Sequence, residues 1–140
     1  MQLYFYNGQP THYFITTDGK CKNQKTNNWL KGQVSKNGYL TYSIKLSNNV
    51  AKRLYAHRMV AETYLPRIEN RTEVNHIDGN KLNNNIKNLE WVASSENKRH
   101  AINSGLYNKL KTVYCFSENR ELIATYKSVS GASRITGISK

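Results

Sequence analysis

Residues 73–100 restrict the fold of this chain more than any other stretch, because strand, turn, loop and strand patterns follow one another there within one short segment. Thr72 to Ile77 has the composition of a strand, and Asp-Gly-Asn at 78–80 is a strong turn signal. The polar run 81–87 predicts a loop, and Asn88 to Ala93 predicts a second strand. The segment therefore predicts a hairpin with a long polar connection.

A helix is expected directly after this hairpin. Ser94 is a good N-cap residue, and Gly105 stands where a left-handed cap would end the helix. Because helical side chains tilt toward the helix N-terminus, Asn97 in the first turn is expected to lean back over Asn75 and His76 at the end of the first strand. Neighbouring strand residues point to opposite faces, so these last two can share a site only at a bulge or where the pairing ends.

Short strands and turns fill residues 1–56, which predicts an antiparallel β meander. The expected strands are Leu3–Tyr6, His12–Ile15, Tyr39–Leu46 and Lys52–Ala56. In the third of these, Leu40, Tyr42, Ile44 and Leu46 alternate and are expected to face one side. His57 to Leu65 then predicts a helix that Pro66 ends, with Met59, Val60, Thr63 and Tyr64 on one face.

The C-terminal part predicts a small hairpin followed by a helix. Residues 111–116 and 122–126 are strand-like around a turn at Glu118-Asn119. Residues 128–135 form a helix candidate with Ser128 or Ser130 as its cap. Residues 136–139 are similar to the turn of a helix-turn-helix, and the printed sequence ends where its second helix would begin.

The formal net charge is +12, from 21 Lys and Arg against 9 Asp and Glu, which favours an anionic partner. The surplus lies in residues 1–50 and 101–140, whereas the middle is nearly balanced. This distribution suits a protein that binds phosphate groups through these two terminal segments. Charge alone leaves open a role in solubility or in binding ribosomal-type RNA.

Cys21 and Cys115 lie far apart and outside any CxxC pair, so neither a disulfide framework nor a zinc knuckle is expected. Two unpaired thiols fit a reducing cytoplasm, which would be the host cytoplasm if the chain is phage-encoded. No apolar run approaches the roughly 20 residues that span a bilayer, and the N-terminus is not that of a signal peptide. No membrane association is expected.

Taken together, HRMVAETYL and EVNHIDGNKLNNNIKNLEWVASSENKRHA resemble the His-Asn-His (HNH) endonuclease family, most closely its phage and intron-encoded homing members. The resemblance covers roughly residues 53–105. Its apolar frame is formed by Val74, Ile77, Leu82, Leu89 and Trp91. The implied fold class is α+β: a ββα-metal (His-Me finger) nuclease core with the N-terminal meander and the C-terminal hairpin and helix-turn-helix-like segment attached.

The resemblance also implies roles for individual residues. His76 matches the general base, and Asn88 matches the Asn that ties the loop and orients the histidine. Asn75 and Asn97 match the protein ligands of one divalent ion, for which Mg²⁺ or Mn²⁺ is expected because both accept oxygen ligands. Other members often carry Asp or His at the position of Asn75. The two amides would bring no formal charge, so weak metal binding without DNA is expected.

His100 and Asp78 are candidates for an additional ligand or phosphate contact. The expected partner is double-stranded DNA, bound by a monomer. Residues 1–56 are interpreted as a basic DNA-binding segment, 57–105 as the nuclease core and 111–140 as a partial modular DNA-binding segment. The expected DNA contacts are Lys22, Lys25, Lys31, Lys36, Lys45, Arg58, Lys98 and Arg99.

The favoured function is a divalent-metal-dependent endonuclease that hydrolyses phosphodiester bonds in DNA, with nicking of one strand at a time as the expected outcome. Two alternatives stay open. Asn75 is compatible with a decayed ligand set, which would make the chain a weak or inactive HNH-derived DNA-binding protein. The charge and the tyrosine content alone are also compatible with an RNA-associated structural protein.

Overall fold

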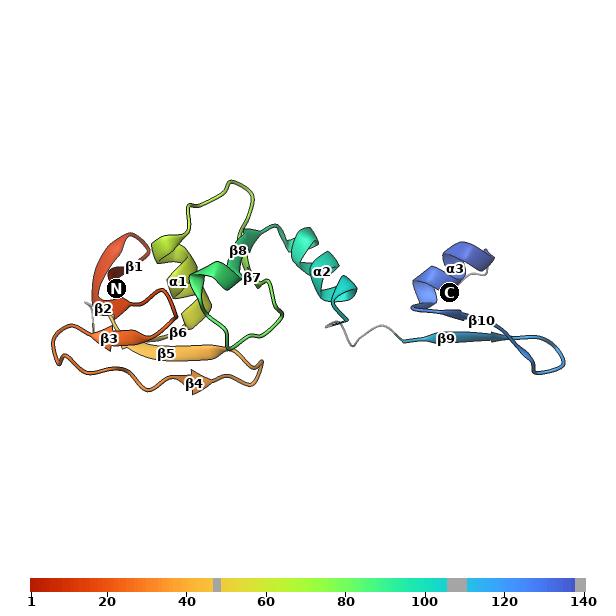
Figure 1. Cartoon of the computed structure of the whole chain (residues 1–140), viewed down its shortest axis with the longest axis horizontal. Coiled ribbons are helices and arrows are strands. Elements are labelled where there is room, and N and C mark those ends of the chain that lie inside the picture. The colour runs from red at the N-terminus through yellow and green to blue at the C-terminus, as the bar shows by residue number, and fades with distance from the viewer. Residues whose placement is uncertain (47–48, 106–110, 138–140) are drawn as a thin grey trace. The chain divides into compact units, whose positions relative to one another are not determined.

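The computed structural model describes residues 1–46, 49–105 and 111–137, which fold as an α+β protein with antiparallel sheets (Figure 1). The chain divides into two compact units, Met1–His100 and Ala101–Lys140. The strands of the first unit are β1 (Gln2–Tyr6), β2 (Gln9–Ile15), β3 (Cys21–Asn23), β4 (Gln33–Val34), β5 (Leu40–Lys45), β6 (Ala51–Tyr55), β7 (Glu73–His76) and β8 (Leu89–Val92). Its helices are α1 (Ala56–Tyr64), the short 3₁₀ helix η1 (Ile86–Asn88) and α2 (Ser94–Asn103), which runs across the boundary.

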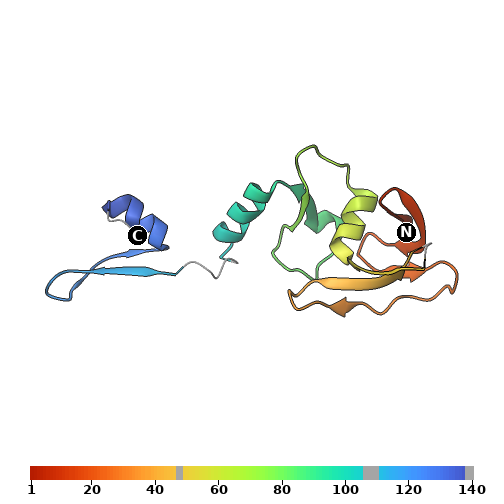
Figure 2. The ribbon, with the colours of Figure 1, turned by 180° about the vertical axis from the view of Figure 1, so that it is seen from behind.

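Three antiparallel sheets surround α1 in the first unit. Their strand orders are β1-β2-β3, β4-β5-β6 and β7-β8. Helix α1 contacts strands of all three sheets, and Figures 1 and 2 show it among them from opposite sides. The short strands need tight turns, and Gly8 and Gly19 supply two of them with φ of 77° and 84°. One central helix thus joins the N-terminal sheets to the β7-β8 hairpin.

A single core unites residues from all parts of the first unit. It contains Tyr4, Tyr13, Ile15, Cys21, Tyr42, Ile44, Ala56, Met59, Val60, Ala61, Val74, Leu89 and Trp91. The predicted faces of β5 and α1 are confirmed at their centres, where Tyr42, Ile44, Met59 and Val60 are buried. The N-terminal strands therefore stabilise the hairpin by sharing its core, and the functional division at residue 56 stays a prediction.

Two residues of the expected apolar frame are not part of this core. Ile77 and Leu82 are 51% and 52% exposed, so their assignment to the frame was wrong. Ile77 follows the last residue of β7, and Leu82 lies in the loop that the Asn80 side chain organises by accepting from the Leu82 N–H at 3.0 Å. Val74, Leu89 and Trp91 are buried as predicted.

The start of α2 differs from the expectation. Ser94 is already inside the helix, and the Glu96 carboxylate accepts a hydrogen bond from the Ala93 N–H at 2.9 Å. A glutamate in the first turn that reaches back in this way performs half of a capping box. Arg71 reinforces it, with Nη2 3.2 Å from the same carboxylate. The helix runs to Asn103, close to its predicted end.

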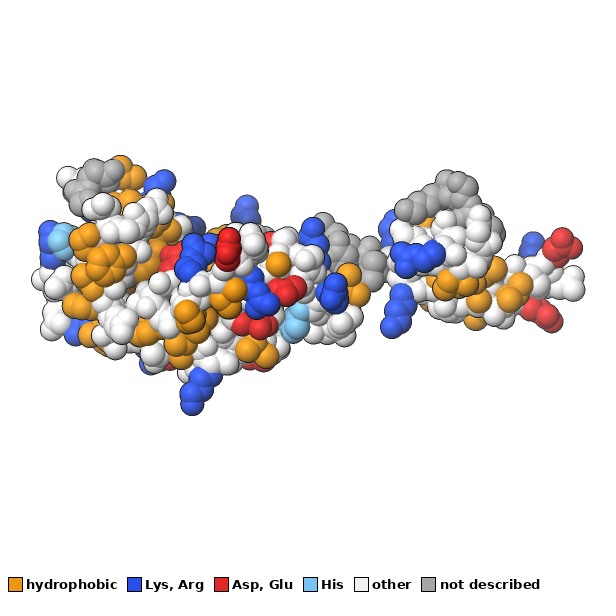
Figure 3. All heavy atoms as spheres, turned by 90° about the horizontal axis from the view of Figure 1, so that it is seen from above, with side chains coloured by type: hydrophobic (Ala, Val, Ile, Leu, Met, Phe, Trp, Pro, Cys, Tyr) orange, Lys and Arg blue, Asp and Glu red, His pale blue; other side chains and the backbone are white. Residues whose placement is uncertain are grey.

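The second unit contains β9 (Val113–Phe116), β10 (Leu122–Tyr126) and α3 (Val129–Thr136). The hairpin and helix are those predicted, and Ser128 is the N-cap, accepting from the Gly131 N–H at 3.0 Å. None of the residues of these three elements is fully buried. Figure 3 shows hydrophobic side chains gathered on the hairpin. The last two residues of the expected helix-turn-helix turn, 138–139, lie outside the described residues.

Both cysteines are free thiols. Cys21 is buried in the core, and burial raises its pKa to about 12. No helix in the described part of the chain has the length and apolar character that crossing a bilayer requires.

Candidate active site

His76 is the last residue of β7 and is only 5% exposed. Its Nε2 lies 3.3 Å from Oδ1 of Asn84, and Nδ2 of Asn84 donates to the carbonyl of Leu82 at 3.0 Å. A backbone carbonyl only accepts, so the amide nitrogen of Asn84 must face it and the amide oxygen must face the imidazole. His76 therefore carries its proton on Nε2, and Nδ1 is the nitrogen that can accept a proton.

Asn84 is buried to 2% exposure and was not identified from the sequence. It belongs to the run Asn83-Asn84-Asn85, in which no periodicity separates the middle residue from its neighbours. Its position depends on the turn before β3. A Cβ atom on Gly19 would lie 2.6 Å from Cβ of Asn84, and the Ile86 N–H donates to the Thr17 carbonyl at 2.8 Å.

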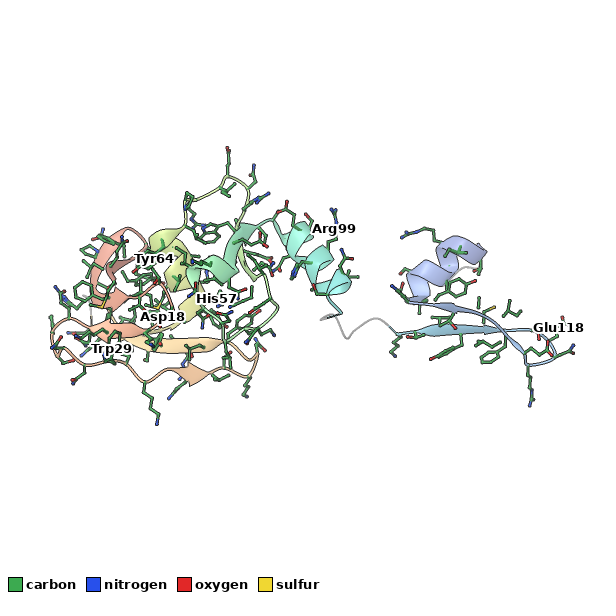
Figure 4. The ribbon with its side chains drawn as sticks, viewed as in Figure 1. Asp18, Trp29, His57, Tyr64, Arg99 and Glu118 are labelled. Atoms are coloured by element: carbon green, nitrogen blue, oxygen red, sulfur yellow. The ribbon has the colours of Figure 1, made fainter. Side chains whose placement is uncertain are left out.

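The ring of Tyr39 and a second imidazole, that of His57 on α1, lie against His76. The ring centroids of His57 and Tyr39 lie 5.0 and 5.9 Å from that of His76, and Figure 4 shows His57 on α1 in the interior of the first unit. Burial, followed by the neighbouring His76 and Arg58, lowers the pKa of His57 to about 3. Burial also lowers the pKa of His76, against the opposing effect of the Asn84 hydrogen bond. Both imidazoles are therefore neutral at neutral pH.

The two expected metal ligands each donate a hydrogen bond to a carboxylate. Nδ2 of Asn75 lies 2.9 Å from Oε1 of Glu90, and Nδ2 of Asn97 lies 2.6 Å from Oε2 of Glu73. Hydrogen bonds from Asn97 and then from Ser94 lower the pKa of Glu73. Two carboxylates, which the expectation of a site without formal charge did not include, therefore lie within hydrogen-bond distance of the two amides.

Asn75 and His76 lie on opposite faces of the hairpin. The register of β7 and β8 is regular, with Asn75 opposite Glu90 and His76 opposite Leu89, and it contains no bulge. His76 is still paired with Leu89, and the Ile77 N–H donates to the Asn88 carbonyl at 2.9 Å, so neither a bulge nor an end of pairing turns His76 to the face of Asn75. Asn97 comes to the face of Asn75, since it contacts Glu73 two residues before it.

The loop between the strands is tied by Asn88 and Asp78. Oδ1 of Asn88 accepts from the Asp78 N–H at 3.0 Å, and its Nδ2 donates to the Asp78 carboxylate and to the Asn83 carbonyl, each at 2.9 Å. Hydrogen bonds from Asn83, Asn80 and Asn88 lower the pKa of Asp78. This network is what the expected tying role of Asn88 requires. Asn88 lies in η1, not in the second strand as predicted.

The expected DNA contacts are spread over the first unit. Lys25, Lys31, Lys36, Lys45, Lys98 and Arg99 are exposed. Lys22 is half-buried with Nζ 5.6 Å from the ring centre of the exposed Trp29. Arg58 pairs with Glu62 at 3.6 Å. His100 is half-buried on α2, the helix from which Arg99 extends in Figure 4.

No cluster of three or more His, Cys, Asp or Glu side chains suited to a metal occurs among the described residues. The amide oxygens of Asn75 and Asn97, with their nitrogens committed to carboxylates, are the oxygen donors that suit a hard divalent ion. Their chemistry fits the ion that the family resemblance implies.

A family model described as HNH endonuclease matches residues 54–99, the segment that contains His57, Asn75, His76, Asn84 and Asn97. Residues 54–99 are an HNH endonuclease segment. The chain is 40% identical over 138 residues to an uncharacterized HNH endonuclease of Acanthamoeba polyphaga mimivirus, a match that covers 96% of this chain and 42% of the relative. A second mimivirus HNH endonuclease is 37% identical over 131 residues, with 33% of its length covered.

A phage protein gives the structural comparison. DNA endonuclease I-HmuI of Bacillus phage SP01 is 32% identical over 104 residues, covering 74% of this chain and 59% of that protein. The solved structure of the HNH homing endonuclease I-HmuI, described as showing DNA binding and cleavage, matches with a TM-score of 0.66 and 26% identity, over 99% of this chain and 85% of that one. The chain thus spans less than half of the two mimivirus relatives.

Proposed function

We propose that this chain is a divalent-metal-dependent DNA endonuclease that hydrolyses phosphodiester bonds, nicking one strand at a time as a monomer. The observation that carries the proposal is the setting of His76. It is buried at the end of β7, inside the segment that matches the HNH family, and the Asn84 amide fixes its tautomer with Nδ1 free of the proton.

His76 acts as the general base in this proposal. Its neutral Nδ1 takes a proton from the water that attacks the scissile phosphate, and the Nε2–H bond to Asn84 keeps the imidazole in the required orientation. A lowered pKa keeps the base unprotonated at neutral pH. Asn88 contributes indirectly, by holding the loop that carries Asn84.

Asn75 and Asn97 would hold the divalent ion, Mg²⁺ or Mn²⁺, through their amide oxygens. When bound, such an ion stabilises the charge that develops on the phosphate and the leaving oxygen. Because Asn75 and His76 adjoin at the end of β7, we place the scissile phosphate at this end of the strand. Asp78 and His100 remain candidates for further contacts to the ion or the phosphate.

Double-stranded DNA is the proposed partner. The relative I-HmuI carries the description of a DNA-binding and DNA-cleaving enzyme, and this chain has a net charge of +12. The exposed lysines of residues 1–56 and Lys98 and Arg99 on α2 would neutralise phosphates along the duplex. The cytoplasm, or that of a host, is the proposed location.

The test is a titration of supercoiled plasmid with Mg²⁺ and with Mn²⁺, followed by identification of the cleaved ends. We expect conversion to the nicked form before any linear form, with 3′-hydroxyl and 5′-phosphate ends, and no conversion with a chelator present. DNA binding without conversion in either metal would overturn the proposal and favour an inactive DNA-binding protein. Preferential binding of RNA would favour the structural alternative.

A further inference from the structure

Two glutamates that the family resemblance did not single out lie directly against the proposed metal ligands. Glu90 accepts from Asn75 at 2.9 Å, and Glu73 accepts from Asn97 at 2.6 Å. Both glutamates are half-buried, and Asn75 is 7% exposed. The same arrangement, an amide that donates to a carboxylate, therefore occurs twice. One pair joins β7 to β8, and the other joins α2 to β7.

The strand register brings both copies to one face of the hairpin. Asn75 and Glu90 are direct cross-strand partners, and Glu73 stands two residues before Asn75 on the same face of β7. Asn97 reaches this face from the first turn of α2. The four side chains therefore gather where the start of α2 meets β7 and β8.

The carboxylates determine which way each amide points. An ionised carboxylate can only accept, so the amide nitrogen must face it. The amide group is planar, so its oxygen is then turned away from the carboxylate and is held there by a charge-assisted hydrogen bond. A fixed oxygen next to a negative charge is a better cation ligand than a freely rotating neutral amide.

We propose that Glu73 and Glu90 are positioning residues that aim the amide oxygens of Asn97 and Asn75 at the divalent ion and supply the negative charge that these ligands lack. This inference rests on the proposed function. Outer partners of this kind fix ligand orientation in metal sites generally, and their loss costs roughly 10–100-fold in metal affinity or activity. In this chain they compensate for the neutral amide of Asn75, at a position where other members often carry Asp or His.

The experiment measures Mn²⁺ binding by electron paramagnetic resonance of the free ion, using the full chain with a DNA duplex and the His76→Ala background to keep the duplex intact. Glu73→Ala and Glu90→Ala are each expected to weaken Mn²⁺ binding by roughly 10–100-fold. Glu73→Gln and Glu90→Gln are expected to lose less than roughly tenfold, because the Gln oxygen still accepts from the Asn amide. Glu69→Ala, at an exposed glutamate, is the matched control.

Thermal melting followed by circular dichroism identifies any variant that fails to fold, and the Gln variants then carry the test. Ala variants that fold and bind Mn²⁺ as the Glu69→Ala control does would overturn the inference while leaving the nuclease intact. Gln variants as impaired as the Ala variants would also overturn the positioning role, because the hydrogen bond to the Asn amide, which Gln keeps, would then contribute nothing. If the chain with native His76 neither nicks plasmid nor binds Mn²⁺ with DNA, the proposed function falls, and the inference falls with it.

Discussion

Gly19 lies against Asn84, so close that a Cβ atom on the glycine would stand 2.6 Å from Cβ of the asparagine. The turn that contains Gly19 belongs to the N-terminal sheet, whereas Asn84 contacts the imidazole of the proposed base at 3.3 Å. The N-terminal segment therefore supports the orientation of His76 in addition to any contact it makes with DNA.

Gly19→Ala should destabilise the first unit and reduce cleavage. The substitution would force alanine into a left-handed backbone conformation, with φ of 84°, and would make its Cβ overlap with Asn84. We expect a loss of about 2–4 kcal/mol in the free energy of unfolding. Gly8→Ala is the matched control, since Gly8 has φ of 77° and an added Cβ there would meet nothing within 4 Å, and it should cost only about 1–2 kcal/mol. Urea unfolding measures both. Equal losses would show that Asn84 does not restrict this position.

Removal of the Asn84 side chain should lower the rate of cleavage without weakening DNA binding. Asn84→Ala deletes the acceptor that fixes the Nε2–H tautomer of His76, and we expect kcat to fall roughly 10–100-fold with KM nearly unchanged. Asn84→Asp keeps an acceptor for the Nε2–H but loses the donor to the Leu82 carbonyl, so its loss of kcat should be smaller than that of Asn84→Ala. A uniform rise in KM, or an Asp variant as slow as the Ala variant, would argue against a role in orienting the imidazole.

Acid should destabilise the protein through His57. Its pKa is about 3 in the folded chain against 6.5 for the ordinary group, so below pH 6.5 the unfolded chain binds a proton that the folded chain does not. The contribution of His57 to the free energy of unfolding is fully present above pH 6.5. It falls by about 1.4 kcal/mol per pH unit as the pH decreases toward 3. The groups that face His57 are His76, Tyr39, Tyr55 and Arg58, and the lowered pKa of His76 acts in the same direction.

Urea unfolding between about pH 7.5 and pH 5 measures this effect, since the carboxyl groups with lowered pKa titrate below that range. The expected result for His57→Gln is a flatter dependence of unfolding free energy on pH, whatever its stability at pH 7.5. Parallel curves for the native chain and the variant would mean that His57 is accessible to protons in the folded state.

The salt dependence of DNA binding should report the lysines of the N-terminal segment. Each phosphate contact contributes about 0.9 to the slope of log affinity against log salt concentration. Single replacements of Lys25, Lys31 and Lys36 by Ala should therefore each lower the slope by about that amount if the residue contacts DNA. Fluorescence anisotropy of a labelled duplex measures the slope. Unchanged slopes for all three variants would exclude these three lysines from the DNA interface.

Local sequence patterns predicted most helices and strands of this fold, but they did not predict the contacts between distant segments. Alternation located β5, and residue type restricted the cap of α3 to Ser128 or Ser130, of which Ser128 is the cap in the structure. Ser94 was misassigned because the capping group is Glu96, which acts from inside the helix. Ile77 and Leu82 are apolar residues of a loop, where composition carries no information on burial.

The candidate site divides in the same way. Asn75, His76, Asn88 and Asn97 were identified through the family resemblance, and the structure gives each a specific partner. Asn84 and the two glutamates were missed, because each matters through a hydrogen bond to a residue distant in the sequence. These partners are His76, Asn75 and Asn97. The Asn75–Glu90 pair follows from the strand register, which sequence spacing alone does not determine, whereas Asn84 and Glu73 meet their partners through the loop and through α2.

The most direct measurement is single-turnover cleavage of supercoiled plasmid by His76→Ala, with DNA affinity measured in parallel. His12→Ala is the control, because His12 is an exposed histidine on β2. We expect His76→Ala to lose cleavage by roughly 10²–10⁴-fold while it binds DNA as the native chain does, and His12→Ala to retain both. Persistent cleavage by His76→Ala at the native rate would contradict the assignment of His76 as the general base.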